Sequence, residues 1–324
     1  MRLAEALTAV VLLGGLTAAQ AQEARGPLLA VSVPEQEAVN LYKLIGWRIE
    51  AAGSVKVGKG PGRMCAAGGL VYAATGAGVA VVDVARASLA GTLSDPGLKA
   101  AFHCTVSPDG GRVYVTDRDN AAVFVFATSS RQLLAKITVP ADPRHSVFTP
   151  DGKSLLVSCG DPNVLAVIDP ARNAVVREIK AVGLDPRPLL VTPDGKNIVV
   201  ALTSSDIMSW YDAKTLEHVN SFGVTRSPQF MVTAGKGERI YVAGAYDGEI
   251  AVVDARESKG DGTPEPRQTG AIPVGPVYSL AISADGDYVF AAPTGGNGTI
   301  VDLRSFKVTK PPALKGAAAV LYLP

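Results

Sequence analysis

Cysteine is scarce in this sequence. The 324 residues include only three cysteines, Cys65, Cys104 and Cys159, and no two of them form a C-x-x-C pair. So few cysteines exclude a small domain held by several disulfides, and the absence of C-x-x-C-H excludes covalent c-type haem attachment. Two interpretations remain open: three buried thiols that pack as small apolar groups, or one disulfide and one free thiol.

An excess of charge is also missing. The chain carries 31 basic and 30 acidic residues, a formal net charge of +1. The charge balance therefore gives no reason to expect nucleic acid or an acidic membrane surface as a partner. Hydrophobic residues make up 47% of the chain, which excludes disorder. The 34 glycines and 22 prolines are spread along the chain, which favours many short elements joined by tight turns.

Long apolar runs are absent after the N-terminal segment. There, an apolar stretch from Ala6 to Leu16 follows Arg2, and Ala19-Gln20-Ala21 has the small-x-small form of a cleavage site. The stretch is shorter than the roughly 20 apolar residues of a spanning helix. We predict a signal peptide over 1–21 cleaved after Ala21, a short tail over 22–27, and a periplasmic or secreted mature chain without a membrane span.

A repeat of 42 to 43 residues dominates the rest of the sequence. Its clearest copies are Ser107–Gly110, Thr149–Gly152 and Thr192–Gly195, each reading S/T-P-D-G, with a weaker copy at 283–286 and a degraded one at 233–237. Each turn lies between apolar runs, and two further strand-like runs complete the unit. Four short strands bounded by Gly, Pro, Asp or Asn are typical of a β-propeller blade.

Counting the units predicts how the ring closes. Six units have four strand-like runs, whereas residues 28–57 supply only three and residues 317–323 supply one more. The C-terminal run can complete the first unit, which removes two exposed sheet edges. The sequence therefore predicts an all-β fold over residues 28–324, a seven-bladed β-propeller with four antiparallel strands per blade.

The repeats resemble those of the YVTN family of β-propellers. Val113-Tyr114-Val115-Thr116 matches the family signature, and S/T-P-D-G and V-x-V-I-D recur around it over essentially the whole mature chain. The family includes YncE-like, surface-layer and periplasmic binding proteins. The resemblance implies an architecture similar to lactonase-type enzymes, the haem d1 domain of nitrite reductases and the large subunit of methylamine dehydrogenase.

In such a ring, residues at the start of each innermost strand lie around one mouth of the central channel, where binding groups gather. Two features recur there: neighbouring units have histidines at equivalent places, and Asp-Pro-Arg occurs at 142–144 and at 185–187. The predicted ligand-binding residues of this mouth are Arg63, His103, Arg144, His145, Arg187, Gln229 and Tyr278.

Each feature has a structural and a functional interpretation. The Asp-Pro-Arg segments either join neighbouring blades or form a basic ring that binds a carboxylate or phosphate. His103 and His145 are either ordinary side chains of the mouth or a metal or haem ligand pair, or one acts as a general acid or base. Two histidines without a third ligand do not complete a zinc site, so no cofactor is predicted from the residues themselves.

The remaining motifs do not identify a reaction. The sequence has no G-x-S-x-G, H-E-x-x-H, P-loop or EF-hand loop. We therefore expect a monomeric, exported binding or interaction scaffold for a small anion, a cofactor or a periplasmic protein partner. The alternative is an enzyme or enzyme subunit, either a lactonase-like hydrolase or a redox protein associated with haem d1 or a quinoprotein, which would require a haem or another cofactor.

Overall fold

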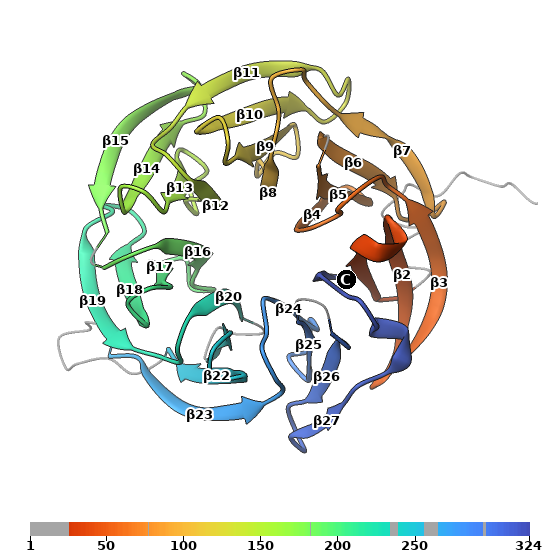
Figure 1. The fold of residues 1–324 in the computed structure, drawn as a ribbon. Coiled ribbons are helices and arrows are strands. Elements are labelled where there is room, and N and C mark those ends of the chain that lie inside the picture. Colours follow the sequence, from red (N-terminus) through yellow and green to blue (C-terminus); the bar gives the residue numbers. More distant parts are fainter. Residues whose placement is uncertain (1–25, 77, 182, 234–238, 256–264, 294–295) are drawn as a thin grey trace, which may run out of the picture.

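Seven four-stranded antiparallel sheets surround a central axis as blades (Figure 1). The structure is a computed structural model that describes residues 26–76, 78–181, 183–233, 239–255, 265–293 and 296–324. The predicted fold class and blade number are confirmed. The predicted signal peptide over 1–21 and most of the degraded turn at 233–237 lie outside the described residues. In the described part of the chain, no helix has both the length and the apolar character needed to cross a membrane.

The first blade joins the two ends of the chain. Its innermost strand is the C-terminal β28 (Ala319–Leu323), followed outward by β1 (Leu28–Val33), β2 (Ala38–Ile45) and β3 (Arg48–Lys56). Strand β28 pairs antiparallel with β1 over five residue pairs, from Leu28↔Leu323 to Ser32↔Ala319. Figure 1 shows this contact as blue ribbon beside red. The prediction that the C-terminal strand closes the ring is confirmed.

The other six blades follow the chain in order, each from its innermost to its outermost strand. Blade 2 holds β4 (Met64–Ala67), β5 (Leu70–Thr75), β6 (Gly78–Asp83) and β7 (Ser88–Leu93); blade 3 holds β8 (Ala101–Val106), β9 (Arg112–Asp117), β10 (Ala122–Ala127) and β11 (Leu133–Thr138); blade 4 holds β12 (Pro143–Phe148), β13 (Leu155–Cys159), β14 (Val164–Asp169) and β15 (Ala174–Lys180). Blade 5 holds β16 (Pro186–Val191), β17 (Asn197–Leu202), β18 (Ile207–Asp212) and β19 (His218–Gly223); blade 6 holds β20 (Pro228–Thr233), β21 (Arg239–Gly244), β22 (Glu249–Asp254) and β23 (Arg267–Pro273); blade 7 holds β24 (Ser279–Ile282), β25 (Tyr288–Ala292), β26 (Thr299–Asp302) and β27 (Lys307–Thr309).

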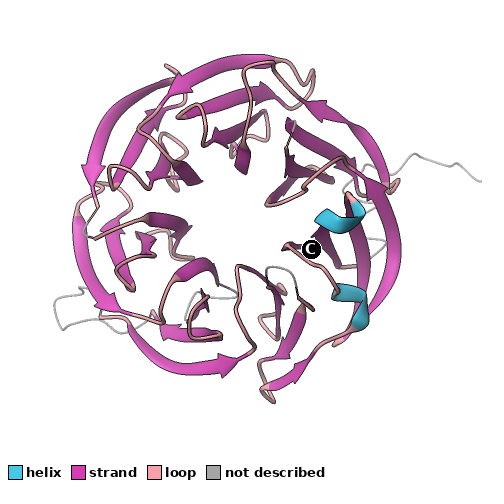
Figure 2. Cartoon of the chain, in the orientation of Figure 1, coloured by secondary structure: helices cyan, strands magenta, loops and turns pink. Residues whose placement is uncertain are grey.

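The helices described in the structure are two short 3-10 turns, η1 (Pro34–Gln36) and η2 (Pro312–Leu314). Both lie close to the junction of the chain ends (Figure 2).

Asp-Gly turns join the first two strands of a blade, as the repeat predicts. Gly152 adopts a left-handed backbone with φ +69°, which costs glycine nothing. The Asp151 carboxylate accepts hydrogen bonds from the Thr149 hydroxyl at 2.7 Å and from the Lys153 amide at 3.1 Å. The aspartate therefore holds the turn together.

The cores lie between blades, because both faces of each sheet are covered. Successive side chains of a strand point to opposite faces. In β9, Val113 and Val115 pack against blade 2, whereas Tyr114 between them packs against blade 4. Each of the seven blade interfaces has a hydrophobic cluster of this kind.

Buried hydroxyls of blades 3, 4 and 5 bind the start of the innermost strand of the blade that follows. At the end of the second strand, Thr116, Ser158 and Thr203 donate hydrogen bonds of 2.7–2.8 Å to backbone carbonyls of the next blade. The first two acceptors are the carbonyls of Arg144 and Arg187. The backbone that carries these predicted site residues is thus held by the neighbouring blade.

The structure decides between the two interpretations of the cysteines. Cys65 and Cys104 form a disulfide that links β4 of blade 2 to β8 of blade 3. Cys159 is a buried free thiol, and burial raises its pKa to about 12. A thiol with so high a pKa has little thiolate and is unreactive at neutral pH.

Candidate functional site

The predicted site residues lie in or directly before the innermost strands. His103 is in β8, Arg144 and His145 are in β12, and Arg187 and Gln229 are in β16 and β20. The other two directly precede innermost strands, Arg63 before β4 and Tyr278 before β24. Five of the seven thus lie in innermost strands and two lie directly before them, and their role in ligand binding stays a prediction.

A cluster of phenyl and imidazole rings lies at this mouth. The rings of His103 and His145 have centroids 4.7 Å apart. His145 also contacts Phe102 of blade 3 at 5.9 Å and Phe230 of blade 6 at 5.7 Å. Blades 4 and 6 are not neighbours, so the contact with Phe230 reaches across the ring.

Arg63 completes the cluster. Its guanidinium lies over the Phe102 ring at 5.3 Å and over the Phe230 ring at 5.0 Å. Arg63 belongs to the start of blade 2, whereas Phe230 belongs to blade 6, so its side chain also extends across the channel. Contact with an aromatic face stabilises a cation, by about 2 kcal/mol when the pair is desolvated.

Arg63 nevertheless has no counter-ion among the described residues. Its Nη1 is inaccessible to solvent and has no hydrogen-bond partner, and among the described carboxylates none forms an ion pair with it. Burial, and then the positive charges of Arg187 and Arg144, lower its pKa to about 9. Arg63 therefore remains a cation at neutral pH, held among aromatic rings and other cations.

The surrounding arginines differ in this respect. Arg144 Nε is 2.6 Å from Asp142, and Arg187 Nη2 is 2.8 Å from Asp185. Arg118 shares the Asp142 carboxylate at 2.9 Å. Each of these three arginines therefore has a carboxylate partner, although two of them share one, whereas Arg63 has none among the described residues.

The Asp-Pro-Arg segments join neighbouring blades, which is the structural interpretation of the two, and their role in binding an anion stays a prediction. Asp142 and Asp185 adopt left-handed backbones with φ +55° and +57° and pair with the arginine two residues on. Arg144 also lies over Phe102 at 5.5 Å, and Arg187 donates to Gln229 Oε1 of the next blade at 2.8 Å. The segments join blades and at the same time add positive charge near Arg63.

Both histidines of the mouth are neutral. Burial, with the nearby Arg63 cation, lowers the pKa of His103 to about 3 and that of His145 well below its usual value. His145 is only 3% exposed, and its Nε2 has no hydrogen-bond partner. His103 Nδ1 lies 3.5 Å from the Ser146 hydroxyl. The imidazoles can accept or donate hydrogen bonds but add no charge at neutral pH.

Two hollows adjoin this cluster. A channel cavity of about 210 Å³ is lined by Arg63, His103 and residues of β20, β24 and β28. A rim hollow of about 710 Å³ is lined by Arg187, Gln229 and Tyr278 with loop residues of blades 5 and 6. The predicted residues are thus divided between the channel and its rim, and neither hollow is lined by all of them.

Part of the site was not predicted. Phe230 was not among the predicted site residues, although it contacts both Arg63 and His145. Phe230 directly follows the predicted residue Gln229, and this position in the aligned repeats could have indicated that it belongs to the site. In the described part of the chain, no group of three or more His, Cys, Asp or Glu side chains could hold a metal ion. The histidine pair therefore finds no third protein ligand among these residues.

The family follows from the sequence of the repeats. A model of the YNCE-like beta-propeller family matches residues 113–316, more than half of the chain. The chain belongs to the YNCE-like β-propeller family. No curated protein matches its sequence.

Solved structures share the fold of this YNCE-like propeller at low identity. A putative 6-phosphogluconolactonase from Bacteroides fragilis is 14% identical with a TM-score of 0.77, over 93% of this chain and 98% of that one. A protein of unknown function from Desulfotomaculum acetoxidans is 13% identical with a TM-score of 0.76, over 90% and 97%. Kuenenia stuttgartiensis hydrazine synthase is 18% identical with a TM-score of 0.63, over 94% and 99%.

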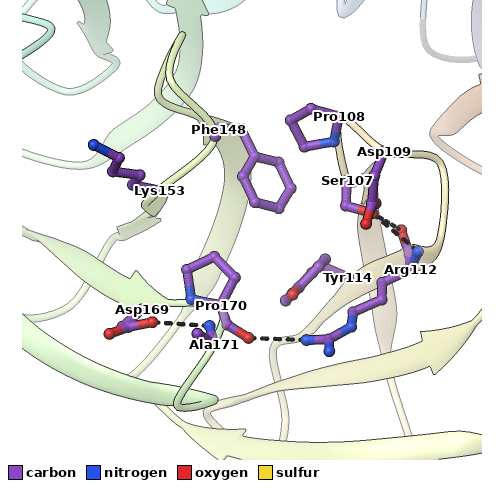
Figure 3. A pocket seen from close by; sticks show the side chains of 11 residues that line it. Ser107, Pro108, Asp109, Arg112, Tyr114, Phe148, Lys153, Asp169, Pro170 and Ala171 are labelled. Atoms are coloured by element: carbon purple, nitrogen blue, oxygen red, sulfur yellow. Dashed lines mark hydrogen bonds between the residues drawn. The ribbon is translucent and has the colours of Figure 1, made fainter.

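The opposite face of the YNCE-like propeller has a hollow of a different kind. A pocket of about 500 Å³ lies between blades 3 and 4, beside the Asp-Gly turns. Figure 3 shows the side chains that line it. Arg112 donates to the Pro170 carbonyl at 2.8 Å, and Phe148 and Tyr114 form an edge-to-face pair with centroids 5.3 Å apart. Its basic residues, Arg112 and Lys153, are matched by two aspartates in the same wall. This pocket lacks the unmatched charge of the channel mouth.

The neutral histidines predict a loss of stability in acid. A histidine whose pKa is lowered by folding binds more protons when unfolded, so stability falls as the pH drops below about 6.5, and for His103 continues to fall until about pH 3. The slope is at most about 1.4 kcal/mol per pH unit for each histidine.

Urea unfolding at pH 7.5, 6.0 and 5.0 measures this slope. His145→Gln should flatten it, whereas His218→Gln, at an exposed position of β19, should leave it unchanged. Equal slopes for the wild type and His145→Gln would show that His145 does not contribute to the acid sensitivity.

Proposed function

We propose that the chain is an exported, monomeric binding protein whose ligand is a small anion held by Arg63 at the channel mouth. The observation that carries the proposal is the buried guanidinium Nη1 of Arg63, which has no hydrogen-bond partner. A buried cation without a counter-ion costs several kcal/mol relative to one in water. An anion bound to the part of the Arg63 side chain that lines the channel cavity would offset this cost, and Arg144, Arg187 and the neutral imidazole of His103 would assist in binding it.

Export is supported by two independent features. The N-terminal segment has the pattern of a signal peptide, and the mature part contains a disulfide between Cys65 and Cys104. Structural disulfides form and persist in oxidising compartments such as the periplasm. The near-zero net charge continues to give no reason to expect nucleic acid as the partner.

The electrostatics weigh against the hydrolytic alternative. A general base works best when its pKa is near the operating pH. The pKa of His103 is about 3, and that of His145 is also far below neutrality. Neutral imidazoles of this kind suit hydrogen bonding to a ligand better than proton abstraction. A binding role therefore has more support than a lactonase-like reaction.

Isothermal titration of the mature chain with sulfate, phosphate, acetate and benzoate at fixed ionic strength tests the proposal. We expect at least one anion to bind and Arg63→Met to weaken its binding about 10- to 100-fold, because a hydrogen bond to a charged group contributes about 1.5–3 kcal/mol. Arg172→Met removes one positive charge from an exposed turn, so it is the matched control and should bind like the wild type.

The stability of the same variant provides an independent check. Without ligand, Arg63→Met should unfold at about the same urea concentration as the wild type, because the loss of the contacts with the Phe102 and Phe230 rings is offset by removal of an uncompensated cation. A binding defect then cannot be attributed to misfolding. If the wild type binds none of the anions, or if Arg63→Met binds as tightly as the wild type, the proposed function is wrong.

A further inference from the structure

The channel cavity adjoins Arg63 directly and has a composition that restricts the ligand. Its walls come from β4, β8, β20, β24 and β28, the innermost strands of five blades. Among the described residues of the wall, Arg63 is the one charged side chain, and His103 beside it is neutral. A ligand in this cavity therefore meets a single positive charge at one place.

The remaining wall is largely apolar. Phe230, Val232, Ile282 and Leu321 line it and are partly exposed. The most buried polar group in it, the Ser279 hydroxyl, already accepts a hydrogen bond from the Val320 amide at 3.2 Å. These walls have few free polar atoms for a hydrated polyanion, but they offer apolar surface that a ligand could cover.

Phe230 links the charged and apolar parts. Its ring contacts the Arg63 guanidinium at 5.0 Å and also lines the cavity. A ligand whose charged group reaches Arg63 would therefore have its uncharged part against Phe230 and the neighbouring walls. The cavity volume of about 210 Å³ sets the size of that part. An apolar cavity of about 150 Å³ is large enough to bind benzene.

We infer that the anion bound at Arg63 is a monocarboxylate with an apolar group of about one ring, and that this group lies in the channel. The inference rests on the proposed function and adds the chemical class of the ligand. It separates the channel from the wider rim hollow, where Asp185, Asp206 and Arg226 add charges of both signs.

Titration of the mature chain with acetate, butanoate, hexanoate and benzoate tests the inference. Burial of one CH₂ group is worth about 0.8 kcal/mol, so each added CH₂ should raise the affinity roughly three- to fourfold until the cavity is full. Benzoate should bind at least about 10-fold more tightly than acetate. Arg63→Met should weaken the binding of every member of the series.

Val232→Thr distinguishes the apolar wall from the anion site. Threonine has nearly the shape of valine, so this variant is expected to fold, but its hydroxyl adds a polar atom to the wall. It should reduce the affinity for benzoate several-fold and leave that for acetate unchanged. Leu134→Asn, at a half-exposed position of the outer strand β11, is the control and should change neither affinity.

The outcomes separate the two proposals. If acetate, sulfate and benzoate bind with equal affinity and Arg63→Met weakens all three, the apolar cavity is not used and the inference is overturned, while the anion site stands. A benzoate affinity that Val232→Thr does not change also overturns the inference. If no anion binds, or if benzoate binding does not depend on Arg63, the anion site and the inference fall together.

Discussion

Deletion of residues 319–324 is expected to leave a chain without a cooperative unfolding transition. This segment is the innermost strand of the first blade, and its pairing with β1 is the contact that joins the two ends of the chain. Ala319 and Leu323 pack in the core between blades 1 and 2, and Val320 packs in the core between blades 7 and 1. One strand thus contributes to two blade interfaces.

The expected loss of stability follows from the burial of the side chains that the deletion removes. Full burial of a valine or leucine side chain is worth about 1.5–3 kcal/mol, and each backbone hydrogen bond adds about 1 kcal/mol. The combined loss is on the order of 5 kcal/mol or more, which is comparable with the total stability of many domains, about 5–15 kcal/mol. The deletion also exposes the edge of β1, which favours aggregation.

Thermal unfolding followed by circular dichroism measures the effect. The control is a variant that lacks only the exposed Pro324, and its unfolding midpoint should equal that of the wild type. A truncated chain that keeps the wild-type midpoint would contradict ring closure by β28.

Loss of the disulfide is expected to lower the free energy of unfolding by about 4 kcal/mol. Cys65 and Cys104 are separated by 39 residues, and the chain-entropy relation gives about this value for a loop of that length. The bond joins the innermost strands of blades 2 and 3, beside Arg63 and His103. It therefore holds two strands of the candidate site together in addition to constraining the unfolded chain.

Urea unfolding with and without reductant isolates this contribution. The free energy of unfolding of the wild type should fall when its disulfide is reduced. A Cys65→Ala/Cys104→Ala variant should have this lower value both with and without reductant. The remaining Cys159 is a buried free thiol, so the variant should not respond to reductant. A wild type that is equally stable when its disulfide is reduced would contradict the prediction.

The fold could be predicted because its signals are local and repeated. An Asp-Gly turn requires a left-handed glycine at one position, and Gly110, Gly152 and Gly195 all have φ near +70°. The pairing of the chain ends followed from the single missing strand at residues 28–57. Each of these predictions depends on pattern within one repeat or on the count of repeats, and neither requires knowledge of side-chain packing.

The site could be predicted only in part, because its decisive contacts cross the ring. Aligned repeats place Arg63 and His103 on adjacent blades, but they do not show that Arg63 lies against Phe230 of blade 6. They also do not show that Arg144 and Arg187 have carboxylate partners whereas Arg63 has none among the described residues. The repeats gave no such signal for the disulfide, because Cys65 pairs with Tyr72 and Cys104 with Val115, so the two cysteines lie at positions one residue apart in their blades.

The most direct test of the anion site is a crystal structure of the protein with 4-bromobenzoate, in which the bromine is located by its anomalous scattering. We expect a carboxylate within hydrogen-bonding distance of the Arg63 guanidinium and the bromine inside the channel beside Phe230. Crystals grown at a saturating ligand concentration that show no ligand at Arg63, with the bromine only in the pocket between blades 3 and 4 or elsewhere on the surface, would contradict this expectation.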